Sequence, residues 1–277
     1  MSITAEQIGL FARAALEQEA QLSPKPGLVD AENCGAHTDM DLALLLRSAA
    51  ALEPFFAALA AQGITDAAFP PDGRISTLRE QGREAERVMF AATGGVNTHK
   101  GALFLLGVLS YAAGHCFVNG RKSPQDICAV GARFCGGVTT ELGENAGRAY
   151  ARYGARGARG EAEDGFPHAL AAREVYTRAF EQGAAEDDAW KIALLRLIES
   201  LDDANVLARC GEETAQILRD RAGEVAARYS SGGVALSGAI RLLDSDCQAW
   251  HASPGGAADV LACAMFLQNI ANNSAKS

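Results

Sequence analysis

The chain has 277 residues, of which 48% are hydrophobic and 21% are charged, and its formal net charge at pH 7 is -9. A chain of this length can bury a substantial core, and its acidic balance disfavours a nucleic-acid surface, for which a clustered basic face is expected. No linker or low-complexity segment divides the sequence, so we expect a single domain over residues 1–277.

Seven cysteines are scattered along the chain without any Cys-x-x-Cys pair, a pattern that indicates reduced thiols and disfavours a zinc site. No basic stretch precedes an apolar run at the N-terminus. Thr4-Ala5-Glu6-Gln7 instead matches a capping box that opens a helix. We therefore expect a cytoplasmic protein that is neither exported nor bound to a membrane.

Apolar residues recur at three- and four-residue spacing along most of the chain, and β-branched residues nowhere alternate over a useful length. The predicted fold class is therefore all-α, a compact multi-helix bundle whose active site is built from the loops between helices. The predicted helices run over Ile8–Ala20, Leu42–Ala61, Ile75–Ala92, Ala102–Ala113, Asp126–Tyr150, Ala169–Gln182, Ala189–Leu201, Glu213–Tyr229, Ser237–Trp250 and Ala257–Ala271.

The run from Gly101 to Val118 is apolar enough to resemble a membrane span. It nevertheless contains Gly107, Ser110 and His115, and it lies between two polar motifs. We expect a buried central helix here, because the rest of the chain offers a core to enclose it.

The first polar motif covers residues 23–30 and 35–41, between the first two predicted helices. Two prolines flank Lys25 and restrict its backbone, while Asp39 and Asp41 set two carboxylates near a helix start. The motif thus offers a cation for phosphate and carboxylates for a metal. The alternative is a surface loop in which Asp39 caps the following helix.

The second motif, Gly94–Gly101, invites comparison with a phosphate-binding P-loop, but His99 stands where the second glycine belongs and a helix precedes it. Its two leading glycines, Lys100 and the amides of the following helix still suit an anion. A glycine helix C-cap with an incidental lysine is the alternative. His99 and His37 lie beside charged groups, where a histidine is either a substrate contact or a structural hydrogen bonder.

Arg148, Arg152 and Arg156 are spaced by four and would form a solvated stripe on one helix face. Beyond them, Glu161 lies in a glycine-rich turn at residues 157–167. A carboxylate held in such a partly desolvated loop could have a raised pKa, as general acid chemistry requires.

Asp202 and Asp203 are followed by Asn205, and two carboxylates with an amide oxygen suit Mg²⁺. An acidic pair that caps a helix is the alternative. Near the C-terminus, residues 253–256 open the last helix, with Asp259 in its first turn. A helix cap explains the serine and the aspartate, whereas the two glycines at this helix start are better explained by anion binding.

Taken together, these runs resemble the triphosphoribosyl-dephospho-coenzyme A synthase family, which serves citrate lyase and malonate decarboxylase, over nearly the whole chain. The segments that carry the resemblance are Pro24–Asp30, Gly35–Asp41, Gly94–Gly101, Gly157–Glu161, Gly165–Pro167 and Ser253–Asp259. The resemblance implies transfer of the triphosphoribosyl group of ATP to the ribose 2′-hydroxyl of 3′-dephospho-CoA, with release of adenine. A separate transferase then attaches the matured product to an acyl carrier subunit.

Such a reaction has oxocarbenium character at the ribose, so it needs a base near the acceptor hydroxyl, help for the departing adenine, and neutralised charge on the triphosphate. Our hypothesis for proton transfer is Asp41 or Glu161. The carboxylates assigned to Mg²⁺ are Asp39, Asp202 and Asp203. The cations assigned to phosphate are Lys25, Lys100, Arg159 and Arg209. The remaining predicted substrate contacts are His37, Asn97, His99, Asn205, Gly255 and Gly256.

The chain departs from the family pattern within residues 202–211. The resemblance predicts Thr, His and Gly at three positions where Ala204, Ala208 and Cys210 stand. Two other classes of function remain open. One is a helical Mg²⁺-dependent hydrolase of nucleotides or ADP-ribose, because paired aspartates also suit metal-activated water. The other is an inactive nucleotide-binding homologue, and the sequence does not decide between a monomer and a homodimer.

Overall fold

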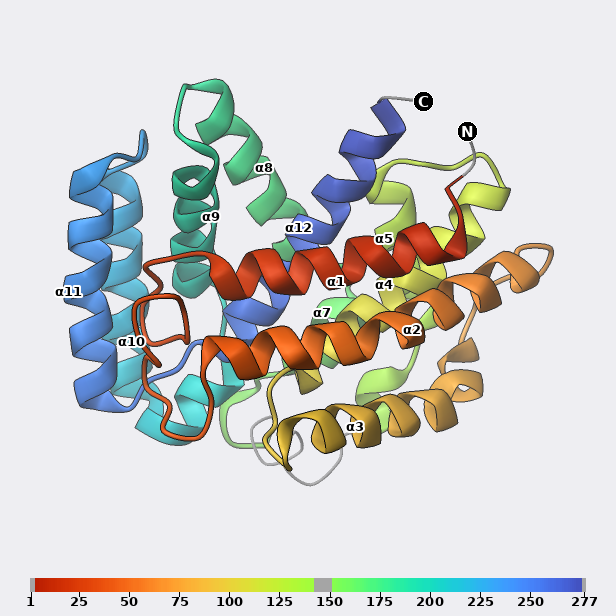
Figure 1. Cartoon of the computed structure of the whole chain (residues 1–277), viewed down its shortest axis with the longest axis horizontal. Coiled ribbons are helices and arrows are strands. Elements are labelled where there is room, and N and C mark those ends of the chain that lie inside the picture. The colour runs from red at the N-terminus through yellow and green to blue at the C-terminus, as the bar shows by residue number, and fades with distance from the viewer. Residues whose placement is uncertain (1–2, 142–150, 276–277) are drawn as a thin grey trace.

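The computed structural model describes residues 3–141 and 151–275, and the regular structure within those residues is helical, without a strand (Figure 1). The helices are α1 (Ala5–Gln21), α2 (Leu42–Asp66), α3 (Arg79–Thr93), α4 (Lys100–Val118), α5 (Pro124–Phe134), α7 (Gly157–Glu163), α8 (Pro167–Glu181), α9 (Glu186–Ser200), α10 (Ala204–Arg228), α11 (Val234–Trp250) and α12 (Gly255–Ala275), with short 3₁₀ turns η1 (Arg74–Leu78) and η2 (Val138–Glu141). The all-α prediction is confirmed.

Two helix starts show how local sequence sets the boundaries. The capping box predicted at the first helix is confirmed: Thr4 Oγ1 accepts the N–H of Gln7 at 3.3 Å, and the N–H of Thr4 donates to Gln7 Oε1 at 2.9 Å. At α2 the cap is Asp41 instead of Asp39, since Asp41 Oδ1 accepts the N–H of Leu44 at 2.7 Å. The alternative that Asp39 caps this helix was wrong by two residues.

Helix α4 is the centre of the core, as predicted. By length and composition α2 and α4 are both long and apolar enough to cross a membrane, but 83% of the apolar window of α4 is buried inside the protein. The two helices touch backbone to backbone: a Cβ added at Gly63 would lie 2.0 Å from the carbonyl oxygen of Tyr111, and one at Gly114 would lie 2.1 Å from that of Ala60. Glycine is required at both crossings.

Helix α12 connects the two ends of the molecule. It packs against α1 and α4 on one side and against α8 and α9 on the other. Helices α10 and α11 lie together at one end of the molecule (Figure 1). The first turn of α12 lies close to the start of α4, where Gly101 meets Asp259, and to the start of α10, where Asp203 accepts the N–H of Ala257.

The predicted helix over Asp126–Tyr150 was wrong for residues 135–141, which do not continue it. Helix α5 ends at Phe134, and a turn follows in which Gly137 has a φ of 84°. Two adjacent glycines favour that break because glycine adopts positive φ without steric cost. Residues 142–150, which include Arg148 of the predicted arginine stripe, lie outside the described residues.

Helix α7 was not predicted, since its glycines suggested a turn. Residues Gly157–Glu163 form a seven-residue helix, and the turn comes later, at Gly165 and Phe166, whose φ values are 86° and 58°. Helix α10 starts earlier than predicted and is interrupted at Gly211, where φ is 80°. Its first part, before that break, carries the motif at residues 202–205 on a helix start.

Candidate active site

Asp203 joins the starts of two helices. Its Oδ1 accepts the N–H groups of Asn205 at 2.8 Å and Val206 at 3.4 Å in the first turn of α10, and its Oδ2 accepts the N–H of Ala257 at 3.1 Å in α12. A Cβ added at Gly256 would lie 2.9 Å from that Oδ2. The glycine at the start of α12 thus allows close approach of an anion, and in this structure the anion is the carboxylate of Asp203.

A second carboxylate, that of Asp259 in α12, faces the start of α4. The backbone N–H of Ala102 donates to it. A Cβ added at Gly101 would lie 1.9 Å from its Oδ2. Sequence reasoning treated Asp259 as a cap of its own helix, whereas the structure places it at the positive end of a neighbouring helix.

Burial raises the pKa of both carboxylates. For Asp203, desolvation outweighs the backbone donors that act in the opposite direction. The pKa of Asp259 lies well above its ordinary value, first because of burial and then because Asp203 and Glu19 are nearby negative charges. A carboxylate in this condition holds a proton more readily than one in water and is a stronger base when ionised.

Lys25 lies in the same region, paired with a carboxylate. The residue is 1% exposed. Its Nζ donates to Glu19 Oε1 at 2.7 Å and to the carbonyl oxygen of Glu19 at 2.6 Å. Its backbone N–H donates to Asp30 Oδ2 at 2.7 Å. The cation predicted for phosphate is therefore enclosed and already neutralised by Glu19.

His99 precedes α4 and is buried, with 4% exposure. Its Nδ1 lies 2.9 Å from Ser48 Oγ, which also accepts the hydroxyl of Thr98 at 2.7 Å. Its Nε2 has no hydrogen-bond partner among the described residues. Burial, assisted by the charge of Lys25, lowers the pKa of His99 to about 4. The imidazole is therefore neutral at pH 7.

The start of the Gly94–Gly101 motif is a glycine helix C-cap, which was the alternative to an anion-binding loop. Gly94 ends α3 in the left-handed conformation, with a φ of 66°. Asn97 Oδ1 accepts the N–H of Lys100 at 3.3 Å, and Lys100 Nζ pairs with Glu86 at 2.5 Å on the surface. Both predicted contacts, Asn97 and Lys100, are exposed at the start of α4.

His37 connects the first motif to the last. Its Nε2 lies 2.8 Å from Ser253 Oγ, just before α12, and its Nδ1 lies 3.6 Å from Asp39 Oδ1. Burial and the charge of Arg209 lower the pKa of His37, against the effect of Asp39. The structure thus brings predicted residues from the first loop, α10 and the start of α12 to one place. Close by, a Cβ added at Gly255 would lie 3.1 Å from Asn205 Nδ2.

Glu161 is buried in α7 and caps α8. Its Oε1 accepts the N–H groups of His168 at 3.0 Å and Ala169 at 3.1 Å, and its Oε2 lies 2.7 Å from His168 Nδ1. The pKa of His168 is raised, chiefly by this hydrogen bond. Sequence reasoning missed His168, because nothing in the helical spacing connects it to a carboxylate across the intervening turn. Arg159, in the same short helix, is half-buried.

The carboxylates assigned to Mg²⁺ do not form a cluster. The side chain of Asp202 is 71% exposed and pairs with Arg219 at 3.2 Å, while that of Asp39 is 61% exposed. Asp41 is exposed at the cap of α2. Among the described residues, no group of three or more His, Cys, Asp or Glu side chains is placed to hold a metal ion.

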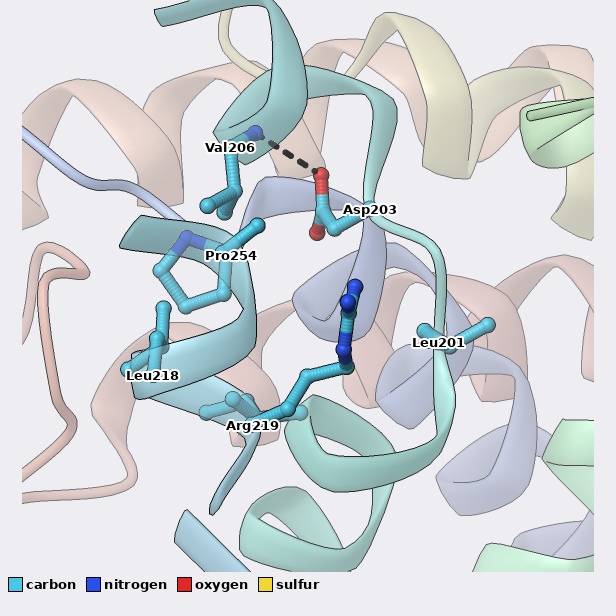
Figure 2. Close-up of a pocket in the computed structure, with 8 residues that line it drawn as sticks. Leu201, Asp203, Val206, Leu218, Arg219 and Pro254 are labelled. Carbon is cyan, nitrogen blue, oxygen red and sulfur yellow. Dashed lines mark hydrogen bonds between the residues drawn. The ribbon is translucent and has the colours of Figure 1, made fainter. Parts of the chain in front are cut away.

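A small cavity lies beside Asp203, walled mainly by apolar side chains such as Leu201, Val206 and Leu218. Figure 2 shows Arg219 reaching from α10 toward Asp203 at one side of it. The Arg219 side chain is 17% exposed. It was not singled out from the sequence, because an arginine inside an amphipathic helix carries no local signal of a site.

The family model of the ATP:dephospho-CoA triphosphoribosyl transferases (CitG) matches residues 5–277. A 2-(5''-triphosphoribosyl)-3'-dephosphocoenzyme-A synthase of Klebsiella pneumoniae is 39% identical over 96% of this chain and 91% of its own length. A second protein of that name from the same organism is 42% identical, covering 94% of this chain and 93% of its own length. A protein of that name from Haemophilus ducreyi is 39% identical over 96% of this chain and 88% of its own length.

Proposed function

The chain belongs to the ATP:dephospho-CoA triphosphoribosyl transferase family, and we propose that the carboxylates of buried Asp203 and half-buried Asp259, at its helix starts, form the active site of that transfer. The protein is an ATP-dependent transferase that acts on dephospho-CoA. The observation that carries the site is the convergence of Asp203 and Asp259 on the first turn of α12, with glycine wherever a Cβ would meet them. Packing alone does not require two carboxylates there.

The reaction breaks the bond between C1′ of the ATP ribose and adenine N9, and it forms a bond from that carbon to the 2′-oxygen of 3′-dephospho-CoA. The carbon gains positive charge as adenine leaves, and a fixed carboxylate stabilises that charge. The acceptor hydroxyl loses its proton to a base. Burial raises the pKa of Asp203 and Asp259, which supports one of them as the base and the other as the stabilising charge.

Of the two carboxylates predicted for proton transfer, Glu161 fits this site better than Asp41. Asp41 is exposed and caps α2. Glu161 is buried. The pKa of Cys263 in α12 is raised first by burial and then by the charges of Glu161 and Asp259, so both carboxylates lie within electrostatic range of that thiol. Cys263 and Asp259 are four positions apart on that helix and so lie on one face. We therefore keep Glu161 in the proposed site.

For the triphosphate, we propose Arg209 and Lys100 as the cations that reach the ligand, because both side chains are exposed. Lys100 is the first residue of α4, and Arg209 in the second turn of α10 is close enough to His37 for its charge to act there. Lys25 is enclosed with Glu19, so its role is to balance the buried negative charge. The predicted Mg²⁺ rests on the spacing of the carboxylates in the sequence. Because Asp203 already accepts three backbone N–H groups and the other two carboxylates are exposed, these side chains do not fit a resident Mg²⁺ ion, and the proposed roles involve none.

We further propose that the product is the precursor of a prosthetic group for the acyl carrier subunit of citrate lyase or malonate decarboxylase. This part of the proposal follows from the resemblance in sequence. The proposed cytoplasmic location rests instead on the scattered cysteines without a Cys-x-x-Cys pair. A separate transferase would use the product, so the carrier is an indirect partner.

The proposed function is tested by identifying the product. Purified protein is incubated with ATP, Mg²⁺ and 3′-dephospho-CoA, and the nucleotides are separated and weighed by mass spectrometry. We expect a compound with the mass of 3′-dephospho-CoA plus a triphosphoribosyl group. Free ribose triphosphate without this compound would indicate a hydrolase, and unchanged substrates despite nucleotide binding would indicate an inactive homologue.

A further inference from the structure

A buried carboxylate holds a half-exposed imidazole at the start of α8. The Glu161 side chain is 4% exposed and the His168 side chain is 36% exposed, with 2.7 Å between Glu161 Oε2 and His168 Nδ1. Two backbone N–H groups fix the other carboxylate oxygen. A carboxylate accepts but does not donate, so Nδ1 must carry a proton. The reactive nitrogen is therefore Nε2, which makes no hydrogen bond within the described residues.

Helices α7 and α8, which carry the pair, both pack against α12, the helix of Asp259. The hydrogen bond with Glu161 raises the pKa of His168 most, and the charges of Asp164 and Asp202 add to it. Asp202 directly precedes Asp203. The pair therefore lies beside the helix that carries Asp259 and within electrostatic range of the start of α10, and the proposed function puts the ribose of ATP at these helix starts.

Capping of α8 uses only one oxygen of Glu161, and the second oxygen binds the His168 imidazole. Glu161 caps α8 through its Oε1, which accepts both N–H groups of the first turn. Its Oε2 is then free to orient the imidazole. A cationic side chain is unfavourable at a helix N-terminus because of the helix dipole, yet here three carboxylates, those of Glu161, Asp164 and Asp202, favour the imidazolium. These neighbours therefore favour a proton on His168 at a position where the helix dipole disfavours one.

We propose that His168 is the catalytic acid that protonates adenine as it leaves, with Glu161 as its positioning residue; this rests on the proposed transferase function. The electron pair of the bond between C1′ and N9 goes to adenine, and the proton on His168 Nε2 moves to an adenine ring nitrogen. Neutral adenine and a neutral imidazole result. The proton of the acceptor hydroxyl goes to the carboxylate of Asp203 or Asp259, and exchange with water restores both groups.

The raised pKa of His168 sets the expected pH dependence. An acid acts only when protonated, so on the alkaline side adenine release should fall as the pH rises through the pKa of His168. On the acid side it should fall when the carboxylate base, whose pKa burial raises, takes up a proton. Because the neighbouring carboxylates raise that pKa above its ordinary value of 6.5, a substantial fraction of the enzyme is active near neutral pH.

The test compares two leaving groups in the variant His168→Asn. Asparagine can keep a donor close to the position of Nδ1, and with it the contact to Glu161, but it has no proton to transfer. We expect kcat with ATP to fall by about 10²- to 10⁴-fold. With N7-methylated ATP, whose base leaves as a neutral molecule without gaining a proton, the variant should react within a few-fold of the wild type.

Equal losses with both nucleotides would overturn the proposal and assign His168 a structural role, and so would unchanged activity with ATP. If the asparagine variant fails to fold, His168→Gln provides the same comparison. The matched control is His251→Asn at an exposed site, where φ is 55° and asparagine is well tolerated. If the wild type releases no adenine from ATP in the presence of 3′-dephospho-CoA, the transferase function fails instead.

Discussion

The Glu161 carboxylate binds three donors, the backbone N–H groups of His168 and Ala169 and the ring nitrogen Nδ1 of His168. Removing its charge therefore tests the proposed site at a single residue. In Glu161→Gln the oxygen can still accept the two N–H groups of α8, but the amide places a donor against His168 Nδ1. We expect turnover to fall at least about 10²-fold while the Kd for ATP changes little. Steady-state kinetics and calorimetric titration measure the two quantities, with exposed Glu174→Gln as the control. Unchanged turnover would remove Glu161 from the mechanism.

His99 makes stability depend on pH. Its pKa is about 4 in the folded protein, compared with 6.5 ordinarily, so below pH 6.5 the unfolded chain binds a proton that the folded chain does not. Stability should therefore fall as the pH decreases from 6.5 to about 4 and then level off. At pH 5 the expected loss is about 2 kcal/mol.

The variant His99→Asn isolates this contribution, because asparagine can keep the contact with Ser48 and does not titrate. Urea unfolding at pH 7 and pH 5 should show a smaller acid-induced loss in the variant than in the wild type. The same loss in both proteins would mean that His99 is not buried and neutral as described.

At this scale the sequence predicts some site residues and misses others for a physical reason. Glu161, Asp203 and His37 are polar exceptions between apolar helical stretches. The structure places Glu161 at the start of α8, and Asp203 and His37 at the start of α12. His168 and Arg219 lie inside ordinary helices. Only the folded chain shows that one faces a buried carboxylate and the other an aspartate beside a cavity.

At the start of α4 the packing requires glycine, because a side chain at position 101 would occupy the space of the Asp259 carboxylate. In Gly101→Ala the new Cβ would lie 1.9 Å from Asp259 Oδ2, so the carboxylate or the helix must move. We expect a loss of about 1–3 kcal/mol in the free energy of unfolding, together with a loss of activity.

The matched control is Gly82→Ala in α3, where an added Cβ meets nothing within 4 Å. There alanine should stabilise the protein by about 0.5–1 kcal/mol, because glycine is a poor helix former. Chemical denaturation of both variants measures the difference. If Gly101→Ala were as stable as Gly82→Ala, the contact between α4 and Asp259 would be refuted.

Helix positions follow from apolar spacing and caps, and that is why most predicted helices are found within a few residues of their bounds. The failures are at glycines. The pair after Phe134 ends α5 in the middle of the predicted helix, whereas the glycines of α7 lie within a helix that buries Glu161. Glycine permits both outcomes, and tertiary packing decides between them.

In the whole molecule, residues far apart in the sequence meet because α12 packs on both ends of the fold. His37 contacts Ser253, and Asp203 contacts Ala257. Local pattern cannot predict such pairings, since neither periodicity nor capping encodes which helix starts will be neighbours. The polar runs between the predicted helices led to the expectation of an active site built from inter-helix loops, and the structure shows a carboxylate, that of Asp203, through which two of the helix starts are joined.

The measurement that tests the central claim most directly is adenine release from ATP by the purified protein, with and without 3′-dephospho-CoA. An enzyme that transfers the triphosphoribosyl group releases adenine only when the acceptor is present, and in equal amount to the product. Adenine released at the same rate without the acceptor, or none under either condition, would contradict the account.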